Sequence, residues 1–192
     1  MPLPETIELL DNQARNLLLQ IADASIRHGL SHGKPLQVDP KNYLDALQAT
    51  RASFVTLQKH GNLRGCIGHL EAFQPLVLDV AENAYAAAFQ DPRFPPLSDN
   101  EMDDLEVHIS VLTPAKPMAF SSEDDLIAQL RPGQDGLILQ DGYNKGTFLP
   151  SVWDSLPQPT EFIKHLKLKA GLPTTHWSEN LKIFRYETES FP

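Results

Sequence analysis

A predicted β-hairpin at residues 53–69 constrains the fold more than any other feature. Residues 53–59 are rich in β-forming side chains, His60-Gly61-Asn62 is typical of a turn, and residues 63–69 continue as a second extended run. Strands this close in sequence pair antiparallel, because parallel neighbours need a long crossover between them. We therefore expect an antiparallel sheet rather than a doubly wound parallel one.

Helices are predicted on both sides of this hairpin. Apolar residues recur at three- and four-residue steps from Glu5 to about His28, and Gly29 is expected to end that helix. Pro75 opens a second helix that runs through Phe89. Shorter helices are predicted after Asp39-Pro40, at a Ser98/Glu101 capping box, from Ser121 or Ser122 to Leu130, and from Pro159 to Ala170. Together with the hairpin, these helices predict an α+β fold.

The remaining strands also follow one another closely. Residues 106–113 alternate, with Val107, Ile109 and Val111 predicted on one face and His108, Ser110 and Leu112 on the other. Further strands are expected at 136–140, 146–149 and 181–188, and Pro114 and Pro117 are expected to mark the start of a second lobe.

Composition narrows the class of protein. The 192 residues contain 41% hydrophobic side chains, a single cysteine and a net charge of -9. One cysteine allows no intramolecular disulfide, and the negative charge opposes generic binding to nucleic acid. No apolar run is long enough for a membrane span. We expect a cytoplasmic protein with no membrane association.

The segment Leu63-Arg64-Gly65-Cys66-Ile67-Gly68 carries the strongest chemical signal. Strand alternation predicts Arg64 and Cys66 on one face, where a guanidinium would favour the thiolate and hold an anion beside it. His69 or His108 is the candidate base, and Gly65 and Gly68 suit the close approach of a ligand. The alternative is a buried, inert cysteine with glycines that only shape a bulge.

Other polar groups are candidate ligand contacts. Asp91 and Arg93 lie in a proline-bounded corner and are predicted to present a charge pair towards the hairpin, or else only to brace the corner. Glu106, His108 and Ser110 lie two apart on one strand face, where they line either a polar cleft or a solvated surface.

Cofactor sites are not indicated. His28 and His32 have the spacing of a helical metal pair, but Gly29 and Gly33 predict a loop there. There is no phosphate loop, zincin motif or dinucleotide fingerprint. We therefore expect neither a metal nor a cofactor.

Longer motifs resemble a known family. These motifs are LRGCIG at 63–68, AYAAAFQDPRFPPL at 84–97, HISVLT at 108–113, GLIL at 136–139, GTFLP at 146–150 and KAGL at 169–172. In this order they resemble the AMMECR domain family, protein A of the AmmeMemoRadiSam system, over nearly the whole chain. Asn62 stands where that family often has a basic residue, and His69 where it usually has a small hydroxyl residue.

The resemblance implies a single AMMECR-type domain, 1–192, with two lobes. The larger lobe is expected at about 1–114 plus 180–192, with an antiparallel sheet formed by both ends of the chain, and a smaller α+β lobe at about 115–179. Implied partners are Memo-type and radical-SAM proteins. The family's biochemical activity is unsettled.

Two functions remain open at this point. One is an enzyme or ligand-binding protein that acts on a nucleotide, a nucleic-acid base or a small anionic metabolite through the Arg-Gly-Cys site. The other is a non-catalytic scaffold for a Memo-type or radical-SAM partner. A purely structural role of the motif is a third reading.

Overall fold

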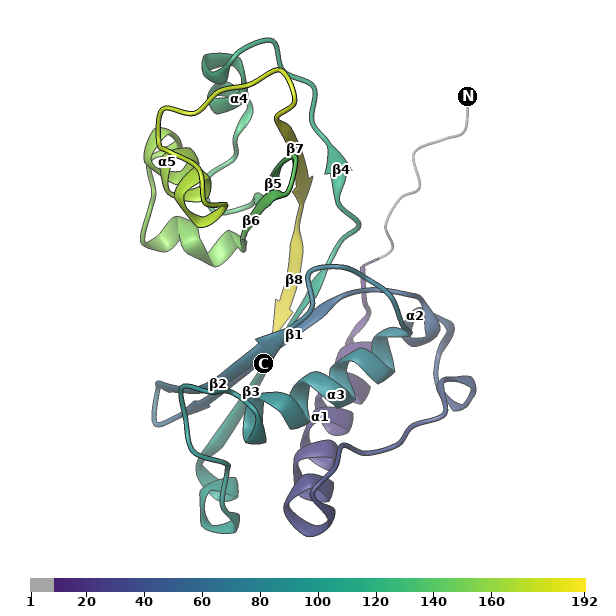
Figure 1. Ribbon diagram of the computed structural model, residues 1–192. Helices are drawn as coiled ribbons and strands as arrows, with labels where there is room; N and C mark the ends of the chain where they lie inside the picture. Colours follow the sequence, from purple (N-terminus) through teal and green to yellow (C-terminus); the bar gives the residue numbers. More distant parts are fainter. Residues whose placement is uncertain (1–8) are drawn as a thin grey trace. The chain divides into compact units, whose positions relative to one another are not determined.

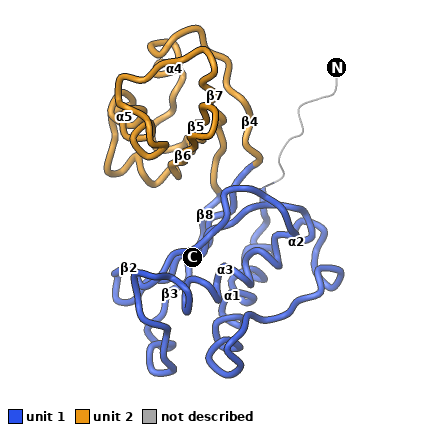
Figure 2. The backbone as a smooth tube through the Cα atoms, viewed as in Figure 1, with its two compact units in different colours: residues 1–113, 189–192 blue, residues 114–188 orange. Residues whose placement is uncertain are grey.

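The structure, a computed structural model, describes residues 9–192 and has an α+β fold (Figure 1). Figure 2 shows its two compact units: of the described residues, unit 1 comprises 9–113 and 189–192, and unit 2 comprises 114–188. The chain therefore leaves unit 1 at Pro114 and returns at Glu189. Residues 180–188, which the sequence placed in the larger lobe, belong to unit 2.

Unit 1 is a four-stranded sheet with helices packed on one face. Its strand order is β2-β1-β3-β8, so the strand formed by residues 188–191 completes a sheet begun by residues 53–68. Its elements are α1 (Asn12–His32), η1 (Pro40–Asn42), α2 (Asp45–Gln48), β1 (Ser53–Lys59), β2 (Asn62–Gly68), α3 (Leu76–Phe89), η2 (Asp99–Asp104), β3 (Leu105–Leu112) and β8 (Thr188–Phe191).

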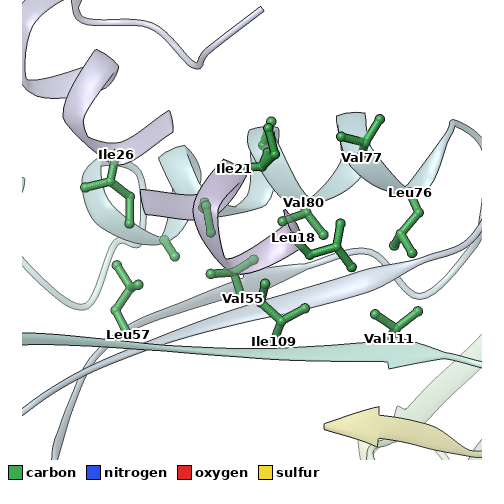
Figure 3. Close-up of a cluster of buried hydrophobic side chains, with 14 of the residues drawn as sticks. Leu18, Ile21, Ile26, Val55, Leu57, Leu76, Val77, Val80, Ile109 and Val111 are labelled. Carbon is green, nitrogen blue, oxygen red and sulfur yellow. The ribbon is translucent and has the colours of Figure 1, made fainter. Parts of the chain in front are cut away.

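The core of unit 1 lies between the sheet and the pair α1 and α3. Leucine and isoleucine side chains of α1 and valines of α3 meet alternate residues of β1 and β3, as Figure 3 shows. The labelled residues are Leu18, Ile21, Ile26, Val55, Leu57, Leu76, Val77, Val80, Ile109 and Val111, all buried. Burial of each such side chain contributes about 2 kcal/mol, so this layer holds the unit together.

Two glycines let elements of unit 1 approach closely. A Cβ on Gly65 of β2 would lie 2.0 Å from the carbonyl oxygen of Ala87 in α3. On α1, a Cβ on Gly29 would lie 2.3 Å from the ring of Phe89. Helix α3 therefore packs against both β2 and α1 at positions where only glycine fits.

A buried ion pair fixes the strand that returns from unit 2. Glu189 of β8 accepts a hydrogen bond from the Leu10 amide at 3.1 Å, and its other oxygen lies 3.5 Å from Arg51. Arg51 also donates to the carbonyl oxygen of Leu112, at the end of β3. Burial lowers the pKa of Arg51 because it disfavours the charged guanidinium, and the Glu189 carboxylate offsets this effect.

Unit 2 is a second antiparallel sheet, of order β4-β7-β5-β6, with its own core. Side chains of α5 pack on β5 and β7, and the buried Trp153 ring stacks on Phe162 with centroids 3.8 Å apart. Its elements are β4 (Lys116–Pro117), α4 (Glu123–Gln129), β5 (Gly136–Asp141), β6 (Asn144–Phe148), η3 (Pro150–Asp154), α5 (Pro159–Lys169) and β7 (Lys182–Tyr186).

Most predicted elements are confirmed, with shifted ends. The hairpin, the helix from Pro75, the Ser98/Glu101 capping box and the alternation of residues 106–113 are all present. The start of the first helix at Glu5 lies outside the described residues.

Two predictions about elements are wrong. Helix α1 does not end at Gly29, because that glycine packs against Phe89, and the left-handed residue that caps the helix is Gly33. The run predicted as one strand, 181–188, forms β7 and the start of β8, which belong to different sheets.

We predict that Gly65→Ala destabilises unit 1. The added methyl group meets backbone rather than a flexible side chain, so the free energy of unfolding should fall by about 3 kcal/mol. Urea unfolding followed by far-UV circular dichroism, with hydrogen exchange of residues 53–68, measures the effect. Gly133→Ala in unit 2 is the control: its φ of 79° makes alanine cost about 1 kcal/mol, without any clash. Equal losses in the two variants would contradict the role assigned to the β2–α3 contact.

Candidate functional site

The site begins with an irregularity in the hairpin. Cys66 pairs with Thr56 and Gly65 with Leu57, but Leu63 pairs with Gln58, so Arg64 is an extra residue in β2. Such a β-bulge interrupts the alternation of side chains between the two faces. The prediction that Arg64 and Cys66 share a face is therefore wrong.

Arg64 is turned towards the segment that follows α3. Its guanidinium donates to both carboxylate oxygens of Glu101, at 2.9 and 3.2 Å, and to the carbonyl oxygen of Pro95 at 2.8 Å. Lys59 lies 3.4 Å from the same carboxylate. Arg64 is 8% exposed, so it braces η2 against the hairpin rather than facing solvent.

The corner after α3 holds the backbone of Cys66 instead. The Cys66 amide donates to the Asp91 carboxylate at 2.9 Å, and the Cys66 carbonyl accepts from Arg93 at 3.3 Å. These two side chains satisfy groups that a further strand would otherwise bind, because β2 lies at the edge of its sheet (Figure 1). The predicted approach of this corner to the hairpin is present.

Asp91 and Arg93 form a fixed charge pair at this edge. Arg93 donates to the two Asp91 oxygens at 3.0 and 2.7 Å, and this hydrogen bonding holds the pKa of Asp91 well below its usual range despite burial. The Asp91 side chain is buried, whereas that of Arg93 is 54% exposed. An accessible guanidinium thus lies beside Cys66, and it belongs to Arg93 rather than Arg64.

The Cys66 thiol lies on the face of the sheet opposite the helices. Its sulfur is 3.2 Å from the Thr56 hydroxyl, and Cys66 is half-buried. Thr56 pairs on its other side with His108, so Cys66, Thr56 and His108 form a row across this outer face. His108 is two strand spacings, about 10 Å, from β2.

Glu106 and Ser110 flank His108 on the same face. They pair with Gln58 and Phe54 of β1, and the Ser110 hydroxyl is 2.8 Å from that of Ser190 in β8. The Nε2 atom of His108 has no hydrogen-bond partner among the described residues and lies 3.9 Å from Glu106. Glu106, His108 and Ser110 therefore form a polar surface on β3, which β1 separates from Cys66.

His69 points the other way. It lies three residues beyond Cys66, its amide donates to the Ser53 carbonyl, and its Nδ1 lies 2.7 Å from Asp79 on the helix-covered side. An odd separation along an extended chain places two side chains on opposite faces. The predicted pairing of His69 with the Cys66 thiol is therefore not formed.

A buried polar cluster around Asp79 was missed by the sequence analysis. The Asp79 carboxylate accepts from the Ser53 amide at 2.8 Å, the Ser53 hydroxyl at 2.6 Å, the Asn83 amide at 3.0 Å and the Gln74 amide at 3.0 Å. Asp79 and Asn83 are four residues apart, and the other buried residues of α3 are apolar, so this spacing was the available signal. The cluster joins α3 to β1 and orients His69.

Internal packing accounts for both glycines of the motif. Gly65 faces Ala87 of α3, and a Cβ on Gly68 would lie 2.3 Å from the Phe54 ring. Gly65 therefore lies on the face opposite the Cys66 thiol, where it cannot contact a ligand at the sulfur.

The part of the chain that the structure describes holds no evident metal centre. It contains no group of three or more His, Cys, Asp or Glu side chains arranged to hold an ion. His28 and His32, expected in a loop, both lie on α1 with their rings stacked 4.2 Å apart. Among the described helices, none combines the length and apolar character of a membrane span.

We predict that the Arg64–Glu101 pair makes stability depend on pH. Hydrogen bonding from Arg64 lowers the pKa of Glu101 from 4.5 to about 2, so its contribution is complete above about pH 5 and is lost as the pH falls towards 2. Glu101→Gln should lower the free energy of unfolding by about 2 kcal/mol at pH 7. That deficit should shrink on acidification, measured by urea unfolding at a series of pH values.

The matched control is Glu161→Gln, which removes an exposed carboxylate paired with Lys164. Its effect should stay within about 0.5 kcal/mol, because exposed pairs contribute little. A Glu101→Gln deficit that stays constant between pH 7 and pH 3 would contradict the prediction.

Comparison with known proteins assigns the chain to a family. The AMMECR1 family model matches residues 19–191. A protein of Methanothermobacter thermautotrophicus is 39% identical over 180 residues, covering 91% of each chain. A Thermotoga maritima protein is 36% identical, with 86% of this chain and 91% of the relative covered.

A solved structure agrees with these relatives. The crystal structure of an uncharacterized protein from Pyrococcus horikoshii matches with a TM-score of 0.79 and 34% identity, over 91% of this chain and 88% of that one. The family predicted from the motifs is thereby confirmed, and so is the α+β fold. The chain belongs to the AMMECR1 family.

Proposed function

We propose that the protein binds a small anionic ligand on the outer face of β2, beside Cys66, with Arg93 as the main contact. The observation that carries the proposal is that Asp91 fixes Arg93 against the backbone carbonyl of Cys66 while more than half of the Arg93 side chain stays exposed. Pre-organised guanidinium groups of this kind bind carboxylate and phosphate oxygens. Nucleotides and small anionic metabolites are the corresponding ligand classes.

Arg93 has N–H groups left over for a hydrogen bond to a ligand. Its hydrogen bonds to Asp91 and Cys66 use Nε and Nη2. Within residues 9–192, Nη1 has no hydrogen-bond partner, and a guanidinium carries two donors there. Those two N–H groups are available to a ligand oxygen without breaking the Asp91 pair.

Nearby carboxylates limit the size of the anion. Arg93 pairs with Asp91 and Arg64 with Glu101, and Glu106 adds a further carboxylate on the outer face. The whole chain carries a net charge of -9. These charges repel an extended polyanion, so the exposed guanidinium of Arg93 suits a small anion.

Binding is favoured over covalent catalysis by the surroundings of the thiol. A cysteine nucleophile needs a base in hydrogen-bond reach. Among the described residues, the Cys66 sulfur contacts the Thr56 hydroxyl. His69 is engaged by Asp79 on the other face, and His108 lies beyond Thr56. We therefore assign Cys66 and Thr56 to ligand contact.

Protection of Cys66 from alkylation tests the proposal, because it is the single cysteine of the chain. Inorganic phosphate and AMP should each slow its modification by iodoacetamide, a neutral reagent, in a saturable manner, whereas uncharged adenosine should not. Arg93→Gln should weaken the protection about tenfold, as expected for the loss of one charge-assisted contact. Mass spectrometry of the intact protein gives the rates.

Arg27→Gln is the matched control for this experiment. Arg27 is an exposed arginine paired with Asp23 on α1, so its removal changes the net charge equally without touching the site. Protection that responds alike to both substitutions, or no protection by either anion, would refute binding at Arg93.

A second candidate function is protein binding next to the same strand. Leu70 and Phe73, in the segment after β2, are exposed by 37% and 62%. Exposed apolar side chains beside a site are typical of contact surfaces. We propose that a Memo-type or radical-SAM protein is the partner.

For this candidate we predict that Phe73→Ser abolishes co-purification with a purified Memo-type or radical-SAM protein. Cys66→Ala should leave the complex intact, since the thiol plays no part in apolar contact. Leu168→Ser, which removes an exposed leucine of α5 in unit 2, is the control. If neither protein is retained by the unmodified chain, the scaffold function is rejected.

A further inference from the structure

A hollow in unit 2 has the dimensions of a ligand site. Its volume is about 690 Å³, and it is lined by two segments, residues 117–121 and residues 177–179 with 181–184. These segments are held together by the pairing of Pro117 with Phe184 and by the hydrogen bond from the Met118 amide to the Ile183 carbonyl, 2.8 Å. Small-molecule sites usually have volumes of 300–1,000 Å³, so the hollow falls within that range.

One wall of the hollow is an aromatic corner. Phe120 and Trp177 meet with ring centroids 5.5 Å apart and planes at 62°. Trp177 is 38% exposed, unlike Trp153, which is buried in the core of this unit. A partly exposed indole held at its edge by a second ring is a preformed surface for stacking.

A buried lysine covers one side of Trp177. The Lys167 ammonium lies 5.8 Å from the indole centroid, is fully buried, and donates to Glu123 at 2.7 Å and to the Thr174 carbonyl at 3.2 Å. Lys167 is not among the residues that line the hollow, whereas Trp177 is. A cation held against one face of a ring disfavours a second cation on the other and favours an electron-rich π system there.

The rim of the hollow carries charge of both signs. Glu179 and Lys182 line it and are exposed, and the lining Ser121 donates its hydroxyl to Asp125 at 3.3 Å. The second carboxylate leaves no net attraction for an anion, and the Lys167 ammonium against the indole disfavours a cation. A neutral ligand with hydrogen-bonding edges fits these surroundings best.

We propose that this hollow binds a planar, uncharged heterocycle of nucleobase size, stacked on Trp177 with Phe120 against its edge. This site lies wholly within unit 2 and is independent of the anion site at Arg93. It gives the chain a second small-molecule site with a different ligand chemistry.

Trp177 fluorescence tests the proposal directly. Adenosine should quench the tryptophan emission in a saturable manner, because stacking brings the base onto the partly exposed indole, whereas the second tryptophan, Trp153, is buried. Phe120→Ala should weaken adenosine binding about tenfold. Phe120→Leu keeps an apolar side chain without the ring and should weaken binding similarly, so the result does not depend on one variant folding. Tyr143→Ala removes a fully exposed aromatic residue of the β5–β6 turn and should change nothing.

Two further probes separate the ligand classes. Tetramethylammonium and inorganic phosphate should produce no saturable change in emission. If adenosine causes no quenching, the proposal is overturned. If tetramethylammonium then quenches in a saturable manner, the hollow binds a cation and not a heterocycle. Cys66→Ser should leave adenosine binding intact, so failure of this site is distinguishable from failure of the anion site.

Discussion

The close contact between β2 and α3 is the constraint on which the candidate site depends. The Ala87 carbonyl occupies the space where any side chain at Gly65 would begin, so the strand and the helix approach this closely because residue 65 is glycine. Helix α3 ends two residues later at Phe89, and the Leu97 amide returns to the Ala88 carbonyl at 2.9 Å. The corner between these points is thereby held against the edge of β2, and Asp91 and Arg93 reach the backbone of Cys66 because of it.

The same corner also covers the exposed edge of β2 at Cys66. An edge strand with free N–H and C=O groups invites pairing with another chain. Here the Asp91 carboxylate and the Arg93 guanidinium take the place of a fifth strand at Cys66. Because the carboxylate is buried and the guanidinium is not, the pair both closes the edge and leaves a cation at the surface. Structural and proposed binding roles therefore reside in the same two side chains.

Local patterns were enough to predict most elements, and non-local packing decided what they missed. The hairpin, the helix from Pro75 and the Ser98/Glu101 box each depend on residues close in sequence. The bulge at Arg64 depends on Glu101 and Pro95, more than thirty residues away, and it moves Arg64 off the face that alternation assigns to it. Gly29 likewise remains inside α1 because of Phe89. The strand period of two residues and the helix period of 3.6 residues describe only neighbours in sequence, so they predict neither the contacts of Arg64 nor that of Gly29.

The point at which the chain passes from the sheet of unit 2 to that of unit 1 cannot be predicted from neighbouring residues. Residues 181–188 predict one strand, yet the polypeptide changes sheets between Tyr186 and Thr188. What fixes the second strand is the buried Glu189, whose charge is tolerable only with Arg51 and the Leu10 amide as partners. Those partners lie more than 130 residues earlier, so the sheet of unit 1 is completed by contacts of very high sequence separation. Since such contacts close a long loop, β8 should join its sheet late in folding, after the hairpin and α3 have formed.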